Sequence, residues 1–198
     1  MRAASDHADW FARLREGAPR IESARLILRV PDISDYPRFA EMFSDPATHH
    51  IGGPLLRGDA WRRFLQMPGA WFTQGFGMFS VIEKSSGLFM GQAGPWFPDG
   101  WPDTEVGYAF HADGRGKGYA TEACTAAIDW AFDALGWANV IQSIDAANIE
   151  SQKVAQRLGA RNIGRGSYPP PLDTHHIDIW TQTREEWFAR RAGIDPSN

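Results

Sequence analysis

The feature that most constrains the fold is a glycine-rich loop between a predicted strand and a predicted helix. Glycine stands at positions 114, 116 and 118, after a strand-like segment at residues 104–110 and before a helical pattern at residues 119–135. Glycine lets the backbone turn tightly and approach a ligand closely. The first amides of a helix lack partners within it, and the helix dipole favours an anion there. Together with the cations of Arg115 and Lys117, the loop predicts an anion site that suits a pyrophosphate.

Two common pyrophosphate motifs do not match this loop. The Walker A pattern requires Gly-Lys followed by Ser or Thr, with another glycine six residues before the lysine. Here Gly118 follows Lys117, and position 111 is histidine. The dinucleotide pattern Gly-x-Gly-x-x-Gly fails because Tyr119 occupies its last position. A nucleotide-binding protein is therefore only a third hypothesis for this chain.

The loop does resemble the cofactor motif of the GCN5-related N-acetyltransferases, which reads Arg/Gln-x-x-Gly-x-Gly/Ala. Arg115, Gly118 and Ala120 stand at its specified positions. The chain departs from the family in its additional residues before Arg25 and in Ala160, where an aromatic residue is common. Four further segments are similar to the branch that contains the ribosomal-protein N-terminal acetyltransferases: residues 25–29, 105–108, 121–123 and 148–160.

The hydrophobic pattern predicts a mixed α/β, or α+β, fold. The resemblance spans residues 21–183 and implies a central, mostly antiparallel sheet of seven strands with helices on both faces. We expect a single acetyl-CoA-binding domain at residues 21–198, preceded by an extension at residues 1–20 with a short helix at residues 8–16. The other predicted strands are residues 25–30, 77–83, 88–92, 139–144, 161–168 and 176–183, and the other helices are residues 32–44, 59–71, 149–158 and a short one within 183–192.

The resemblance also implies how acetyl-CoA is held. The strand at residues 106–110 would separate from the strand at residues 139–144 and offer its backbone to the pantetheine arm. An amide near Ala109 or Phe110 would polarise the thioester carbonyl. Asn148 would hydrogen-bond the arm, although it also reads as a helix N-cap. The pyrophosphate would lie on the amides of Arg115, Gly116, Lys117, Gly118, Tyr119 and Ala120.

Attack on a thioester requires a neutral amine, so a base near the amine is expected. Glu105 is the first candidate because it begins the strand beside the thioester, although it could be an ordinary surface carboxylate. His111 is a second candidate, for which simple packing is favoured. The resemblance assigns protonation of the leaving thiolate to Ser151, which otherwise belongs only to the first turn of its helix.

The remaining candidates point to less specific roles. The loop at residues 94–103 forms either an acceptor wall, with Asp99 or Asp103 attracting an amine, or rigid packing. The histidine pairs at 49–50 and 175–176 predict no metal site, because neighbouring side chains on a strand point to opposite faces. Cys124 lies on the apolar stripe of a helix and is expected in the core.

Composition limits the partners. A net charge of −4 without a Lys/Arg-rich block argues against nucleic acid. No apolar run approaches the roughly 18 residues of a membrane helix, and the start of the chain does not resemble a signal peptide. With one cysteine, a reducing cytoplasm is the expected location. A homodimer is left open.

The sequence therefore predicts an enzyme that transfers an acetyl group from acetyl-CoA, without a metal, to a primary amine. The branch resemblance favours a protein or peptide N-terminal α-amine as the acceptor. The alternatives are a small-molecule amine, such as an aminoglycoside, a polyamine or an amino-acid analogue, and a non-catalytic acyl-CoA-binding module. A pure binding module would need neither Glu105 nor Ser151.

Overall fold

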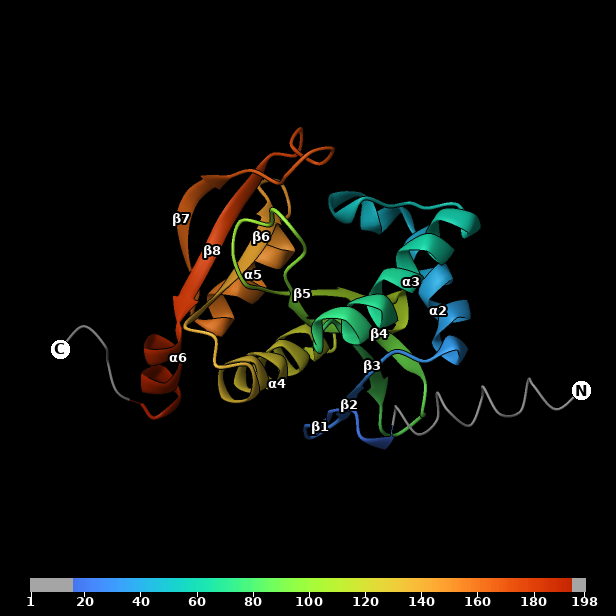
Figure 1. Ribbon diagram of the computed structural model, residues 1–198, viewed down its shortest axis with the longest axis horizontal. Coiled ribbons are helices and arrows are strands. Elements are labelled where there is room, and N and C mark those ends of the chain that lie inside the picture. Colours follow the sequence, from blue (N-terminus) through green and yellow to red (C-terminus); the bar gives the residue numbers. More distant parts are fainter. Residues whose placement is uncertain (1–15, 194–198) are drawn as a thin grey trace, which may run out of the picture.

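The computed structural model describes residues 16–193 and contains an eight-stranded sheet flanked by helices (Figure 1). The strand order is β1-β2-β3-β4-β5-β6-β8-β7, and every neighbouring pair is antiparallel except β5 and β6. The mixed, mostly antiparallel architecture is confirmed. The strands are β1 (Arg20–Glu22), β2 (Leu26–Arg29), β3 (Phe79–Glu83), β4 (Phe89–Trp96), β5 (Glu105–Phe110), β6 (Asn139–Asp145), β7 (Arg161–Gly166) and β8 (Ile177–Thr183).

The predicted number of seven strands is wrong by one, because β1 pairs with β2 at the edge of the sheet. β1 has only three residues and carries two charged side chains, so it has no apolar alternation to detect. The helices are η1 (Ile33–Asp35), α2 (Tyr36–Ser44), η2 (Pro46–Ile51), α3 (Arg57–Gln74), η3 (Ala112–Gly114), α4 (Tyr119–Ala134), α5 (Ile149–Leu158) and α6 (Arg184–Arg191). All but the last residue of the helix predicted at 8–16 lies outside the described residues.

Two apolar layers cover the two faces of the sheet. On one face α4 buries the stripe that includes Cys124, Ile128 and Phe132 against β2 to β5, which confirms the core position of the cysteine. On the other face α2 and α3 pack Phe39 and Phe64, among other residues, against the sheet. The part of the sheet that matters for function is its centre, between the two apolar layers.

Strand β4 runs further than expected, because residues 94–96 were predicted to begin a loop. They pair with β5 in the register Gly94↔Gly107, Pro95↔Val106 and Trp96↔Glu105. The pairing of β4 with β3 ends earlier, at Ala93↔Phe79. Beyond that point the strand has a neighbour on one side only, so Pro95 is tolerated although it lacks a backbone N–H.

Helix α5 has the predicted bounds and α4 begins at the predicted residue, whereas α3 extends beyond residues 59–71 at both ends and the helix predicted at 32–44 is divided into η1 and α2. Asp32 caps η1 by accepting from the Ser34 amide, and Asn148 caps α5 by accepting from the Ser151 amide. Within residues 16–193, no helix combines the length and the apolar character required to cross a membrane.

Candidate active site

The centre of the site is the separation of β5 from β6. These parallel strands share one register pair, Glu105↔Ile141, where the Ile141 amide donates to the Thr104 carbonyl at 2.8 Å. Within the described chain the ladder does not continue beyond this pair. A cavity of about 710 Å³ opens beside the separated strands. The gap predicted between residues 106–110 and the sixth strand is therefore present.

The cavity lies between the two halves of the molecule. One wall comes from η2 and the start of α3, the opposite wall from β6, the start of α5 and the loop after β7, and β4 and β5 form the floor. Gly107 keeps the floor open at the centre. A Cβ there would lie 2.8 Å from Cε of Met78 and 3.3 Å from Oε1 of Glu105. A side chain at 107 would therefore displace the carboxyl group that the cavity contains.

Glu105 is 7% exposed and lines the cavity at the point where the strands part. Its Oε2 accepts a hydrogen bond of 2.7 Å from the Trp101 indole nitrogen. Burial raises the pKa of Glu105 to about 7, and the Trp101 N–H and the groups of Ser143 oppose that rise. A buried carboxyl group with this pKa can accept a proton near neutral pH. It is not the surface carboxylate that the sequence also allowed.

Ser151 and Asn148 both line the cavity from the first turn of α5. The Asn148 side chain accepts from the Ser151 amide at 3.1 Å through Oδ1, which leaves its NH₂ group for another partner. Tyr108 also lines the cavity, and Ser151 is among the groups that affect the pKa of its hydroxyl group. Burial raises the pKa of Tyr108 above its ordinary value. The helix cap and a ligand-binding role for Asn148 are thus compatible.

The glycine-rich loop presents a run of free amides. Within residues 16–193, the N–H groups of residues 116–120 have no hydrogen-bond acceptor, whereas those of Gly114 and Arg115 donate to His111 and Ala112. Gly116 and Gly118 have φ values of 72° and 78°, in the left-handed region that favours glycine. A Cβ on Gly116 would meet no atom within 4 Å. The loop therefore offers an open row of donors at the start of α4.

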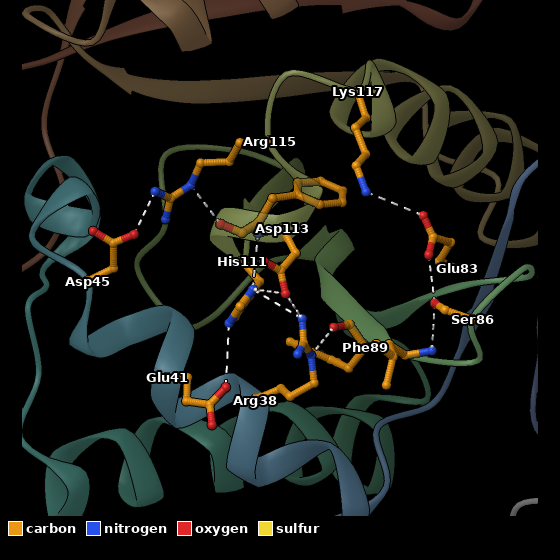
Figure 2. A network of polar contacts seen from close by, with 12 residues as sticks. Arg38, Glu41, Asp45, Glu83, Ser86, Phe89, His111, Asp113, Arg115 and Lys117 are labelled. Carbon is orange, nitrogen blue, oxygen red and sulfur yellow. Dashed lines mark hydrogen bonds and ion pairs between the residues drawn. The ribbon is translucent and has the colours of Figure 1, made fainter.

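The two cations of this loop are not free, in contrast to the simple expectation from sequence. The Arg115 guanidinium donates to Asp45 at 2.7 Å and to the Phe110 carbonyl at 3.0 Å. The Lys117 ammonium lies 3.6 Å from the Glu83 carboxylate (Figure 2). Arg115 thus fixes the turn after β5, and the attraction of an anion depends mainly on the amides.

His111 belongs to a polar network beside the loop and does not line the cavity. Its Nδ1 lies 3.1 Å from Nη2 of Arg38, and its Nε2 lies 3.5 Å from the Glu41 carboxylate (Figure 2). Asp113 accepts from the same Arg38 group at 2.7 Å. This arrangement matches the favoured packing role and leaves Glu105 as the candidate base.

The acidic loop residues differ in position. Asp99 lines the cavity and is exposed, whereas Asp103 accepts from the Asn139 side chain at 2.8 Å and from the Thr104 amide, away from the cavity. Only Asp99 is placed to meet an acceptor.

The histidine pair at 49–50 was wrongly expected on a strand. Both residues lie in η2, and their rings are 3.8 Å apart. A 3-10 helix places neighbouring side chains on adjacent rather than opposite faces. His50 pairs with Asp145 at 2.8 Å. Among the described residues, no group of three or more potential ligands is placed to hold a metal ion.

Several polar residues of the site were missed by sequence reasoning. Four of them line the cavity and have buried side-chain atoms without a hydrogen-bond partner in the described chain. Such atoms are costly unless a ligand or water satisfies them. They lie on β5, on β6 and on the adjacent β4, so a ligand rich in amide groups would satisfy them. No local pattern marks them, because only the separation of the strands brings them together: Gln92, Tyr108, Gln142 and Ser143.

Comparison with known proteins identifies the same architecture. Residues 25–161 match the family described as the acetyltransferase (GNAT) domain. An acetyltransferase from Agrobacterium tumefaciens C58 has a similar structure, with a TM-score of 0.75, 25% identity, and coverage of 84% of this chain and 95% of that chain. The ribosomal L7/L12 α-N-protein acetyltransferase RimL shares the fold with a TM-score of 0.67 at 14% identity, over 84% of this chain and 94% of that chain.

A curated relative, the uncharacterized N-acetyltransferase YnaD of Bacillus subtilis, is 32% identical over 86 residues. That match covers 43% of this chain and 51% of YnaD. Protein YkkB of the same organism is 32% identical over 87 residues, with coverage of 43% and 51%. The chain thus spans about half the length of the curated relatives it matches.

Proposed function

The chain belongs to the acetyltransferase (GNAT) domain family, and from this premise we propose that it transfers the acetyl group of acetyl-CoA to a primary amine. The proposal is supported by one arrangement of groups around the central strands. The gap between β5 and β6 borders a cavity that contains a buried carboxyl group with a pKa of about 7, and the loop after β5 carries the free amides of residues 116–120. A diphosphate group, an amide-containing arm and an amine each have a fitting partner there.

Acetyl-CoA fits the residues present. The amides of residues 116–120 would hold the diphosphate, and the edge of β5 at Ala109 and Phe110 would pair with the pantetheine arm. Asn148, with its uncommitted NH₂ group, and the unpartnered Gln142 side chain would hold the amides of that arm. Bound acetyl-CoA supplies the activated acetyl group.

Residues around the cavity then accept and donate the protons of the reaction. Glu105 takes a proton from the acceptor ammonium, so that the neutral amine nitrogen can form the new N–C bond. As that bond forms, the C–S bond of the thioester breaks. An amide near Ala109 or Phe110 stabilises the charge on the carbonyl oxygen. Ser151 relays to the departing sulfur the second proton, which the nitrogen loses as it becomes an amide. Free CoA and the acetylated amine are the products.

The acceptor has two candidate forms. Similarity to the ribosomal-protein branch supports a protein or peptide N-terminal α-amine. The cavity supports a small molecule, because the aromatic rings of Trp96, Trp101 and Tyr168 line it and Trp101 stacks on Tyr168 with their centroids 4.4 Å apart. We favour the small amine on this structural ground.

An acceptor screen tests the function. Purified protein with acetyl-CoA is offered peptides with free N-termini and a panel of small amines, and release of the free thiol is followed. We expect thiol release that depends on an amine and that falls sharply in Glu105→Gln and Ser151→Ala. An unchanged kcat/KM in both variants would refute the assigned roles. CoA binding without turnover of any amine would instead favour the non-catalytic binding module.

A further inference from the structure

A partly buried arginine lines the cavity without an acidic partner. Arg63 of α3 donates from Nη1 to the Ile51 carbonyl at 2.7 Å, and its Cζ atom lies 4.4 Å from the centre of the Phe43 ring. Within residues 16–193 its Nε and Nη2 groups contact no acceptor, and it forms no ion pair. A guanidinium group has five N–H donors and stays charged in proteins. A charge in this position is costly unless an anion joins it.

Two of the acidic residues that line the cavity with Arg63 already have partners. Asp59 accepts from Arg62 at 2.6 Å, and Asp145 pairs with His50 at 2.8 Å. Neither carboxylate is therefore available to neutralise Arg63.

The position of Arg63 is fixed rather than adjustable. The bond to Ile51 and the contact with Phe43 hold the guanidinium on two sides. On a third side lies Gly52, where a Cβ would come within 3.2 Å of Nη1. An arginine that is held in place with unused donors is typical of a site that recognises a carboxylate, phosphonate or sulfonate group.

Arg63 and Glu105 act on the same part of the cavity. Burial raises the pKa of the Tyr168 hydroxyl; the Glu105 carboxylate raises it further, and the Arg63 guanidinium opposes the rise. Tyr168 therefore lies within electrostatic reach of both. Arg63 and Glu105 also line the same cavity of about 710 Å³, which thus holds a positive group and a proton acceptor together.

We propose that the acceptor is a small amine that also carries an anionic group, with the anion bound by Arg63 and the amine placed beside Glu105. This inference rests on the proposed transfer function and narrows its substrate class. Arg63 selects the substrate and orients its amine, so it is a binding residue that does not itself move a proton. Neutral amines and polyamines would be poor acceptors because they leave the buried guanidinium unpaired.

Matched ligands and variants test the inference. The ligands are the common L-α-amino acids with their carboxamides, and taurine and 2-aminoethylphosphonate with ethanolamine, whose neutral hydroxyl group replaces the anion. Binding is measured by calorimetry in the presence of saturating CoA, for the wild type, Arg63→Gln, Arg63→Lys and the control Arg57→Gln. Arg57 is suited as a control because it is an exposed arginine of the same helix that does not line the cavity.

We expect an anionic amine to bind the wild type about tenfold or more tightly than its neutral counterpart. That preference should vanish in Arg63→Gln, persist in part in Arg63→Lys and stay unchanged in Arg57→Gln, while CoA affinity stays constant in all four proteins. Equal binding of both ligand classes to the wild type, or a preference that survives in Arg63→Gln, would overturn the inference.

Turnover with the same ligands separates the two proposals. Binding that depends on Arg63, without thiol release from acetyl-CoA, would refute the transfer function and leave the anion site standing. Rapid acetylation of neutral and anionic amines alike would support the transfer function and refute the anion site.

Discussion

At the scale of single residues, Glu105 illustrates how position changes the chemistry of a common side chain. The same carboxyl group on an exposed strand would be ionised and weakly basic at neutral pH. Burial raises the pKa of Glu105 to about 7, while the Trp101 N–H keeps one oxygen hydrogen-bonded. The group can therefore exchange a proton with an amine under neutral conditions.

The activity of Glu105→Gln follows from this position. Because the variant keeps the shape and loses the base, we expect kcat/KM to fall about 100-fold. In the wild type kcat/KM should rise with pH through about 7, as Glu105 loses its proton. The variant should lack this limb. The matched control is Glu185→Gln, an exposed carboxylate of α6 that does not line the cavity, which should change kcat/KM no more than about twofold. If kcat/KM of Glu105→Gln still rises with pH through about 7, the rise comes from another group.

The same group links stability to pH. The pKa of Glu105 is about 7 in the folded protein and near 4.5 in an unfolded chain, so the folded state binds the proton more tightly. The stability from this proton is fully present below pH 4.5 and is lost as the pH rises through about 7. The difference in free energy of unfolding between Glu105→Gln and the wild type, taken as variant minus wild type, should be about 3 kcal/mol larger at pH 7.5 than at pH 4.5. Urea titrations at the two pH values measure this difference, and parallel curves would contradict it.

Sequence reasoning reached Glu105 but not Arg63, and the reason is physical. Glu105 begins a strand that leads into a recognisable loop, so its neighbours along the chain reveal its place. Arg63 lies on α3, where an arginine normally faces solvent. Only the packing of η2 and α2 around Arg63 holds its side chain at the cavity, where it forms no ion pair within the described residues.

At the scale of elements, the site depends on where strands and helices end. Alternation of apolar residues and the positions of glycine were enough to predict the strands β2, β3, β5, β6 and β8 and the start of α4. Edge strand β1 and the end of β4 could not, because three mostly charged residues and a Gly-Pro pair resemble a loop until a neighbouring strand pairs with them. The divergence of β5 from β6 was expected only from family resemblance.

The glycine-rich loop gives a prediction with an internal control. Gly116 and Gly87 have φ values of 72° and 69°, and a Cβ on either would meet no atom within 4 Å. Replacement by valine should therefore destabilise the protein to a similar extent at both sites, by about 1–3 kcal/mol. Only Gly116 lies among the free amides at the start of α4.

We expect Gly116→Val to raise the Kd for CoA about tenfold or more and Gly87→Val to leave it unchanged. Calorimetric titration of both variants with CoA measures this. Equal losses of affinity would show that the effect comes from general destabilisation, and no loss at Gly116 would remove the loop from the CoA site.

At the scale of the whole molecule, the sheet consists of two parts joined weakly at its centre. Strands β1 to β5 form one ladder, strands β6 to β8 another, and a single register pair connects them (Figure 1). Packing of α4 against α5 supplies a second connection on one face. A ligand that lies in the gap would therefore contact both parts and stabilise them together.

Hydrogen exchange with and without CoA checks this consequence. Amides at residues 106–110 and 142–146 that face the gap should exchange quickly in the free protein and slow markedly with CoA, because they gain an acceptor or lose contact with water. The pairing between β2 and β3 should be unaffected.

Binding at a CoA concentration 100 times Kd stabilises the native state by about 2.7 kcal/mol, which for a chain of this size raises the Tm by about 5–10 °C. ATP and NAD should produce neither effect. Protection spread evenly over the sheet, or the same shift with ATP, would mean that the gap is not where the cofactor binds.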